Sequence, residues 1–380
     1  MDTDITKAAD MDGKLERIAL YRLRVPLLMP YRLAFGVVES YDTILVELTD
    51  RDGRRGFGEA TILAGYSDET IAESWPAAKL FAETIADPAL GSLEEANSRF
   101  GVKFPFAATA IGTALEMLAN TDLLRVARDF SVPLVGLLAA KDEDGLRREF
   151  EEQAESGYRT FKVKVGFDVD KDAARVKLVQ RIVNGKGLIR LDANQGFTAE
   201  QGIAFVNALD PTDIELFEQP CAAGDWESHL AVVRQASVPM MLDESIHGLA
   251  EIEQAAASKA ASYIKLKLMK LITMRGLVNA ISRIKALGMT PVLGNGVACD
   301  IGCWMEACVA SRHIDNAGEM NGHLKTAVQL LTSKLEFGEG ALRVRAGFSP
   351  SLDAGSAQRH AVDYCAFSPP KPIKSLARSP

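Results

Sequence analysis

Five charged side chains recur between residues 164 and 267 of the 380-residue chain at a nearly constant interval. A lysine comes first, three carboxylates follow, and a second lysine ends the series, at successive intervals of 28, 26, 25 and 24 residues: Lys164, Asp192, Glu218, Asp243 and Lys267. An interval of this length accommodates one strand, one helix and their connections. We therefore expect each of these residues at the equivalent place on its own strand.

The three carboxylates predict a metal site. Asp192, Glu218 and Asp243 would meet at one end of the strands, where they would repel one another and raise one another's pKa. A divalent cation removes this conflict, and carboxylate oxygens are hard ligands that suit Mg²⁺ or Mn²⁺. One such carboxylate alone is more often a solvated loop charge. Three in register between two lysines favour Mg²⁺, with Mn²⁺ as the alternative.

The two outer lysines predict proton-transfer chemistry. Lys164 and Lys267 flank the three carboxylate strands and would face one another across the metal. A nearby cation lowers the pKa of a lysine, which makes the side chain usable as a base. Lys162 and Lys265 each stand two residues before one of these lysines, on the same face of the strand. They could supply that positive charge or form ion pairs with the metal-binding carboxylates, and both alternatives stay open.

The elements that carry these residues begin at about residue 131. Short apolar or β-branched runs alternate with helical stretches, which indicates parallel strands with right-handed crossovers. About eight such units predict an α/β fold, a (β/α)₈-type (modified TIM) barrel over residues 131–340 with its active site at the C-terminal ends of the strands. Alternation turns Val163 and Leu191 toward the helices and the charged residues toward the barrel interior. An open doubly wound sheet is the alternative.

The first 130 residues predict an N-terminal α+β capping domain. Residues 14–25 and 42–50 alternate like strands, and Arg51-Asp52-Gly53 is typical of a hairpin turn. Residues 67–85 and 106–130 have helical periodicity. The C-terminal segment 341–380 is expected to complete this domain, because residues 342–345 form a late strand that could return to it.

Composition narrows the possible partners. The net charge is −8, so no basic surplus exists to bind nucleic acid. The longest apolar run, near residues 134–140, is far shorter than the roughly 18 residues that span a bilayer, so no membrane association is expected. The five cysteines form no C-x-x-C pair and are expected to be reduced thiols of a cytoplasmic protein. The expected partner is a small-molecule carboxylate substrate, and a homo-oligomer is expected.

These residues resemble those of the enolase superfamily, specifically the muconate lactonizing enzyme (mandelate racemase/muconate cycloisomerase) subgroup. The resemblance covers nearly the whole chain and rests on ordered motifs: the lysine pair at 162–164, D-A-N at 192–194, F-E-Q-P at 217–220, L-D-E-S at 242–245, L-K-L-M-K at 266–270 and G-F-G-E-A at 56–60. It implies that Asp192, Glu218 and Asp243 bind Mg²⁺ and that Lys164 and Lys267 form an acid–base pair. The family reaction removes a proton α to a carboxylate, and Mg²⁺ stabilises the resulting enediolate.

The chain departs from the family pattern at three places. Leu271-Ile272 stand where a glycine pair often follows the second lysine motif, and Lys265 stands where an asparagine often precedes the base. Residues 131–140 enter the barrel without the usual Gly-Gly loop. These departures bear on the substrate and leave the expected metal site unchanged.

The leading functional hypothesis is a racemase or epimerase of an amino acid or an amino-acid derivative. Two opposed lysines can remove a proton from one face of a carbon and return it to the other. The alternatives are a muconate-type cycloisomerase and a dehydratase of a β-hydroxy acid or hydroxyproline. A non-catalytic metal-binding scaffold is disfavoured, because both lysines accompany all three carboxylates.

Further residues are candidates for supporting roles and for substrate recognition. Glu319 could accept a substrate ammonium or hydrogen-bond to Lys267 and orient it. Asp300 could bind a cationic amine or cap the helix that begins near residue 301. Supporting roles are predicted for Lys162, Lys265, Asn194, Glu244 and Glu319. Substrate contacts are predicted in loops of the capping domain and after the last two barrel strands: Tyr31, Arg32, Tyr66, Asn295, Asp300 and Asn321.

Overall fold

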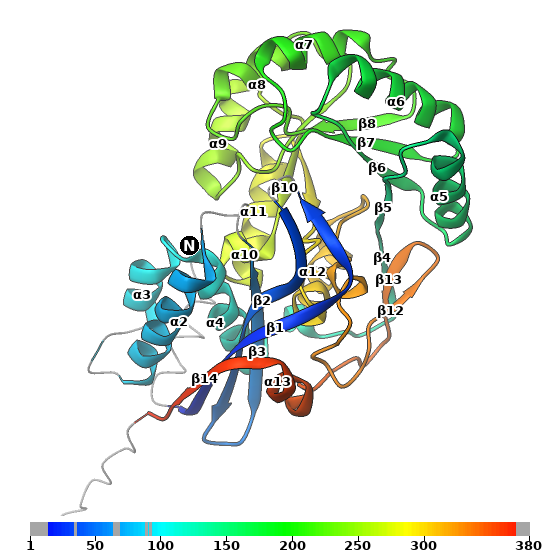
Figure 1. The fold of residues 1–380 in the computed structure, drawn as a ribbon. Helices are drawn as coiled ribbons and strands as arrows, with labels where there is room; N and C mark the ends of the chain where they lie inside the picture. The colour runs from blue at the N-terminus through cyan, green and yellow to red at the C-terminus, as the bar shows by residue number, and fades with distance from the viewer. Residues whose placement is uncertain (1–13, 34–35, 64–68, 88–89, 91–92, 370–380) are drawn as a thin grey trace, which may run out of the picture.

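Seven parallel strands form the wall of the barrel. The computed structural model describes residues 14–33, 36–63, 69–87, 90 and 93–369. Its largest sheet has the order β11-β10-β9-β8-β7-β6-β5, so strands that follow one another in the chain lie side by side (Figure 1). Their bounds are β5 (Val135–Leu138), β6 (Thr160–Lys164), β7 (Leu188–Asp192), β8 (Ile214–Glu218), β9 (Met240–Leu242), β10 (Tyr263–Leu266) and β11 (Thr290–Leu293). This sequential order is that of a (β/α)₈ barrel and excludes a doubly wound sheet.

A short segment around Gly318 closes the barrel in place of a full eighth strand. Gly318 forms a parallel bridge with Leu134, and its N–H donates to Pro133 O at 2.9 Å. On the other side, the Glu319 N–H donates to Leu293 O at 3.2 Å. A Cβ on Gly318 would lie 2.4 Å from Leu293 O, so only glycine fits where the last strand meets this segment.

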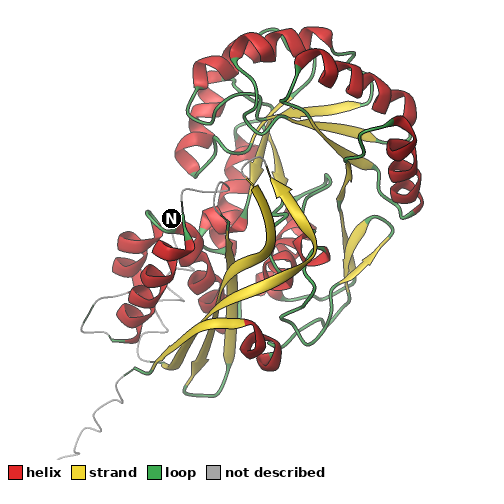
Figure 2. Ribbon diagram, viewed as in Figure 1, coloured by secondary structure: helices red, strands yellow, loops and turns green. Residues whose placement is uncertain are grey.

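Helices cover the outside of the barrel sheet (Figure 2). The strands alternate as predicted, because Val163 and Leu191 are fully buried in the core between strands and helices. Capping side chains mark the start of several helices; for example, Thr198 and Gln201 form a capping box at the start of α7. The barrel helices are α5 (Glu143–Glu155), α6 (Val169–Val183), α7 (Ala199–Ala208), α8 (Trp226–Val233), α9 (Leu249–Ser258), α10 (Leu268–Leu271), α11 (Met274–Ala286) and α12 (Asp300–His313).

A four-stranded antiparallel sheet of order β14-β1-β2-β3 forms the capping part. The hairpin turn predicted at Arg51-Asp52-Gly53 joins β2 to β3, and Gly53 has φ 79°. A Cβ on Gly58 would lie 2.4 Å from Ala110 O, so β3 and α4 approach one another closely at this glycine. The elements are β1 (Leu15–Leu33), β2 (Gly36–Asp50), β3 (Arg55–Ile62), α2 (Ile71–Ala86), α3 (Leu93–Ala96), α4 (Pro105–Leu118) and β14 (Ala361–Phe367).

The long hairpin of β1 and β2 reaches the last unit of the barrel (Figure 1). Leu27 and Thr326 form an antiparallel bridge, and the Leu28 N–H donates to Lys325 O at 2.8 Å. The hydroxyl of Tyr41 lies 3.5 Å from Gly296 O. The capping sheet therefore lies against the loop after β11 and the segment after Gly318.

Three sequence-based boundaries were wrong. The helix expected over 106–130 ends at Leu118, because Asn120 adopts φ 56° and the chain continues into a 3₁₀ turn, η2 (Asp122–Leu124). Tyr31 and Arg32 were expected in a loop but lie in β1, whose backbone pairs there with β2.

The third correction concerns the C-terminal strands. The late strand at 342–345, observed as β13 (Ala341–Val344), does not join the capping sheet. It pairs with β12 (Glu336–Gly338) and β4 (Phe130–Pro133) in a separate three-stranded sheet. The later strand β14 pairs with β1 and completes the capping sheet. The division of the chain at residues 130 and 340 stays a prediction.

Across the ranges that the structure describes, no helix combines the length and the apolar character needed to cross a membrane.

Candidate active site

Lysine and carboxylate side chains form a cluster of ion pairs at the C-terminal ends of the barrel strands. Asp192 ends β7 and lies in register with Glu218 at the end of β8. The Lys162 Nζ lies 2.7 Å from Asp192 Oδ2 and 3.0 Å from Glu218 Oε2. The Lys265 Nζ lies 3.0 Å from Glu218 Oε1 and 3.5 Å from Asp243 Oδ2. Lys162 and Lys265 thus bridge neighbouring carboxylates, which is one of the two roles that the sequence left open for them.

The two outer lysines lie at opposite ends of this row. Lys164 ends β6, where its Nζ contacts Asp192 Oδ2 at 2.6 Å and also the side-chain oxygen of Asn194. Lys267 directly follows β10, and its Nζ lies 2.7 and 2.9 Å from the two oxygens of Asp243. The Lys164 side chain is 41% exposed and that of Lys267 only 3%. The barrel therefore holds one lysine in reach of solvent and one buried lysine on the far side of the carboxylates.

Burial and paired charges set the pKa values in this cluster. Burial would raise the pKa of Asp192, but the ammonium groups of Lys162, Lys164 and Lys265 outweigh it and hold that pKa below its usual range. The pKa of Asp243 is likewise lowered, mainly by Lys267. The pKa of Glu218 is instead raised to about 7, first by burial and then by the charge of Asp192. The carboxylates therefore compete for the available positive charge, as expected where like charges converge.

The donor set fits a hard divalent cation. Asp192, Glu218 and Asp243 are at most 3% exposed and lie at the ends of successive strands. Glu218 Oε2 lies 3.0 Å from the Lys162 ammonium group, and Asp243 Oδ1 lies 2.7 Å from that of Lys267. Within the described ranges no three His, Cys, Asp or Glu side chains stand together as a metal cluster, and ammonium groups lie between the carboxylates. The carboxylates are thus arranged around positive charge, which the lysine ammonium groups supply in this structure.

A second layer of polar side chains ties the loops after β7, β8 and β9 together. Asn194 donates from its backbone N–H to Asp192 Oδ1 at 2.9 Å and from its side chain to Glu244 Oε1 at 3.0 Å. Gln219 is fully buried, and its Oε1 accepts from the Asp243 N–H at 2.9 Å. Its Nε2 donates to Ser245 Oγ at 2.7 Å. Asn194, Glu244 and Gln219 therefore fix the backbone beside the three carboxylates.

Glu319 lies between two lysines. Its Oε1 is 2.8 Å from the Nζ of both Lys162 and Lys265. These two ammonium groups outweigh burial and hold the pKa of Glu319 well below its usual range. The expectation that Glu319 orients Lys267 by a hydrogen bond is wrong, because its contacts go to Lys162 and Lys265, whereas Lys267 lies against Asp243.

The predicted substrate contacts are scattered. Asp300 is fully buried and accepts hydrogen bonds from the backbone of Leu330 and Leu331 at 2.8 to 3.0 Å, so it neither caps α12 nor faces a substrate amine. Asn295 is 2% exposed and lines a small cavity under the capping sheet.

Asn321 lies nearer to the lysine cluster. A Cβ on Gly296 would be 3.4 Å from Asn321 Oδ1 and 4.0 Å from Glu319 Oε2, which puts these two side chains beside the same loop. For Tyr31 and Arg32 the structure describes the backbone alone, in β1. Tyr66 falls outside the described residues.

Three residues with a part in this site were missed. Lys270 donates to the backbone oxygens of Asp243 and Ile246 at 3.1 and 2.7 Å, and burial together with Lys267 lowers its pKa to about 8. Gln219 and Lys270 belong to quoted motifs, so their place beside the strand ends was a usable signal. Glu306 carried none, because it stands in the middle of a helix far along the chain.

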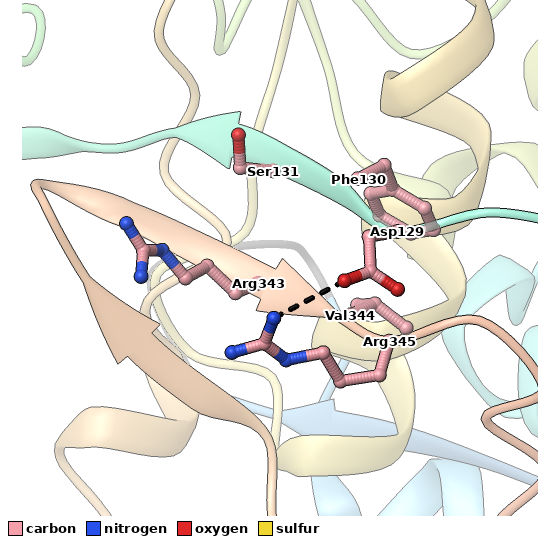
Figure 3. Close-up of a pocket in the computed structure, with 6 residues that line it drawn as sticks. All are labelled: Asp129, Phe130, Ser131, Arg343, Val344 and Arg345. Carbon is pink, nitrogen blue, oxygen red and sulfur yellow. Dashed lines mark hydrogen bonds and ion pairs between the residues drawn. The ribbon is translucent and has the colours of Figure 1, made fainter.

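A second hollow in the protein lies away from this cluster. It has a volume of about 250 Å³ and lies between β4 and β13, lined by Asp129, Phe130, Ser131, Arg343, Val344 and Arg345 (Figure 3). Arg345 is paired with Asp129 at 3.1 Å and with Glu336 at 3.1 Å. Because its charged side chains already form ion pairs on an exposed surface, this hollow does not support a second binding site.

Family membership follows from comparison with known proteins. A family model described as enolase C-terminal domain-like matches residues 145–353, more than half of the chain. The chain belongs to the enolase superfamily. The crystal structure of a dipeptide epimerase from Cytophaga hutchinsonii, complexed with Mg and the dipeptide D-Ala-L-Val, superposes with a TM-score of 0.82. At 18% identity over 93% of this chain and all of that one, it shows that the fold is shared.

The similar relatives in this superfamily are isomerases. An N-succinyl-L-Arg/Lys racemase of Bacillus cereus is 26% identical over 78% of this chain and 82% of that protein. A hydrophobic dipeptide epimerase of Citrifermentans bemidjiense is 29% identical over 79% and 84%. Muconate cycloisomerase 1-2 of Acinetobacter lwoffii is 27% identical over 88% and 91%. The enolase superfamily member described here is accordingly an isomerase.

Proposed function

We propose that this isomerase racemises or epimerises an amino-acid derivative by moving the proton α to its carboxylate. The observation that carries this proposal is the pair of lysines at opposite ends of the carboxylate row, Lys164 on β6 and Lys267 after β10. Two bases on opposite faces of one carbon can remove a proton from either enantiomer and return it to the other side. Lys164 and Lys267 are the proposed bases.

We propose Asp192, Glu218 and Asp243 as the residues that hold a divalent cation, Mg²⁺ with Mn²⁺ as the alternative. Their buried oxygens are the hard ligands such ions prefer. When bound, the cation would polarise the substrate carboxylate and offset the negative charge that develops as the α-proton leaves. Lys162 and Lys265 form ion pairs with the same carboxylates, while the hydrogen bond between Asn194 and Glu244 joins the loops beside them.

The substrate is proposed to carry an acylated rather than a free α-amine. Glu319 is already engaged by two ammonium groups, and Asp300 by three backbone hydrogen bonds. The acidic side chains suggested by the sequence as acceptors for a free ammonium are therefore occupied. An N-succinyl amino acid and the C-terminal residue of a dipeptide both have an acylated α-nitrogen, and relatives named for such substrates match this chain.

A muconate-type cycloisomerase is the second candidate. The Acinetobacter lwoffii cycloisomerase matches 88% of this chain, a larger share than the racemase and epimerase cited above. That reaction turns a diene diacid into a lactone and needs only one lysine for proton transfer. Action in the cytoplasm and assembly into a homo-oligomer stay predictions; in support of the former, all five cysteines are free thiols.

Proton exchange in D₂O tests the proposal. Purified protein with Mg²⁺ is incubated with N-succinyl amino acids, dipeptides, free amino acids, hydroxyprolines and cis,cis-muconate, and the products are followed by NMR. We expect the wild type to place deuterium at the α-carbon of the product enantiomer. Lys164→Ala and Lys267→Ala should each abolish racemisation, while each still exchanges the α-proton of one enantiomer with retention.

The outcomes separate the candidate reactions. Lactone formation that tolerates loss of one lysine would replace the epimerase proposal by the cycloisomerase, and loss of a hydroxyl to give a keto product would indicate a dehydratase. Racemisation at the wild-type rate by Lys267→Ala would remove Lys267 as the second base. A chelator should stop every exchange, and added Mg²⁺ should restore it.

A further inference from the structure

We infer that Glu306 is a positioning residue for Lys267, acting on the backbone behind the lysine from the outer helix α12. This inference rests on the proposed function of Lys267 as a base. Glu306 is fully buried in a helix whose other inward residues are almost all apolar. Burying a carboxyl group is costly unless hydrogen bonds compensate it, so its partner at this place is informative.

The partner of Glu306 is the residue next to the proposed base. Glu306 Oε1 accepts a hydrogen bond from the Leu268 N–H at 2.8 Å. Lys267 immediately precedes Leu268 and has an extended backbone, φ −133° and ψ 132°, before the chain turns into α10. The Lys267 side chain makes no capping bond to this turn. Glu306 therefore supplies the acceptor that holds the turn, and with it the Cα from which the Lys267 side chain extends.

The same segment is held from the other side by the capping helix α4. Thr109 Oγ1 lies 3.1 Å from Met269 O, so Lys267–Met269 is fixed between α12 and α4. Glu306 and Thr109 both line a small cavity of about 10 Å³ together with Glu59 and Asn295. Glu59 accepts from the Gly302 N–H at 2.7 Å, one helical turn before Glu306. The capping part thus contacts α12 through Glu59 and the Lys267 segment through Thr109, while Glu306 joins α12 to that segment.

The chemistry of Glu306 suits an acceptor rather than a second base. Burial raises the pKa of Glu306 to about 8, and Lys267 and Lys265 only partly oppose this. A carboxyl that is largely protonated near neutrality still accepts through its carbonyl oxygen, as a glutamine would. Glu306→Gln should therefore preserve the function, whereas Glu306→Leu cannot accept the Leu268 N–H.

The first test follows each face of the α-carbon separately. In D₂O, Glu306→Leu should slow α-proton exchange tenfold or more for the enantiomer whose α-proton Lys267 removes, because small displacements of a catalytic group greatly reduce its rate. Exchange of the enantiomer served by Lys164 should stay within about threefold of the wild type. Glu306→Gln should restore both rates and leave the pH profile unchanged. Equal losses on both faces, or no loss on either, would overturn the inference.

A matched control separates positioning from loss of stability. Glu69 is also a buried carboxyl that accepts a backbone N–H, from Phe106 at 2.7 Å in the capping part. Glu69→Leu should lower the unfolding midpoint, and it should change α-proton exchange of the two enantiomers to the same extent. If Glu306→Leu fails to fold, Glu306→Asp shortens the reach by one methylene and should show the same selectivity in smaller degree.

The second test needs no substrate and stands apart from the proposed function. Amide hydrogen exchange at Leu268 should speed up tenfold or more in Glu306→Leu and stay at the wild-type rate in Glu306→Gln. Unchanged protection of Leu268 in Glu306→Leu would overturn the inference even if the wild type racemises its substrate. Absence of α-proton exchange by the wild type, with the expected amide result, would count against the proposed function alone.

Discussion

Glu319 illustrates how one buried charge depends on its partners. It lies 2.8 Å from the ammonium groups of both Lys162 and Lys265, which keep partners in Asp192, Glu218 and Asp243. Glu319→Gln keeps an acceptor oxygen but removes the negative charge that two buried ammonium groups share. We expect a loss of about 1 to 3 kcal/mol in the free energy of unfolding at pH 7, measured by urea titration.

The pH dependence of this loss follows from the lowered pKa of Glu319. A carboxyl whose pKa is lower in the folded than in the unfolded state stabilises the protein fully above the unfolded value. That contribution disappears as the pH falls toward the folded value. The difference between wild type and Glu319→Gln should therefore be smaller at pH 3.5 than at pH 7. A difference that grows on acidification would contradict the ion pairs.

At the scale of elements, α4 makes a close contact with the turn after α10. Ile272 has φ 68°, a conformation that is strained for a β-branched residue. Gly112 on α4 makes room for it, since a Cβ there would lie 2.5 Å from Ile272 O. Gly112→Ala should therefore destabilise the protein by about 1 to 3 kcal/mol, although alanine favours helices.

A second glycine serves as the control for this substitution. Gly355 lies in α13 (Ala354–His360), where a Cβ would meet only the ends of the Arg359 and Asp353 side chains. Gly355→Ala should leave the free energy of unfolding unchanged or raise it slightly. Thermal and urea unfolding of both variants check the pair, and equal stability of Gly112→Ala and wild type would contradict the close contact.

At the scale of the whole molecule, the proposed metal ligands join three successive barrel strands. Asp192 and Glu218 end β7 and β8, and Asp243 directly follows β9. A ligand that binds only the folded chain stabilises it, by about 2.7 kcal/mol at a concentration 100 times its Kd. Mg²⁺ should therefore raise the unfolding midpoint relative to chelator-treated protein, and Asp192→Asn should abolish the rise. Identical midpoints with chelator and with Mg²⁺ would contradict the metal site.

Much of the barrel and the convergence of its charged strand ends could be predicted from the sequence, because both depend on local periodicity. The intervals of 24 to 28 residues between charged strand ends correspond to the observed βα units. The alternation within strands correctly placed Val163 and Leu191 toward the helices. Since parallel strands align their C-terminal ends, a repeat read along the chain was enough to bring Asp192 and Glu218 into register.

The pairing of side chains was decided only by the tertiary structure. Glu319 pairs with Lys162 and Lys265, which lie 157 and 54 residues away in the chain. Asp300 accepts hydrogen bonds from backbone N–H groups about 30 residues later. The hydrogen bond from Leu268 to Glu306 and the pairing of β14 with β1 also join separate parts of the chain. No local periodicity specifies such contacts. They form only when barrel closure and docking of the capping sheet bring separate segments together, because each buried polar group then needs a hydrogen-bonding partner.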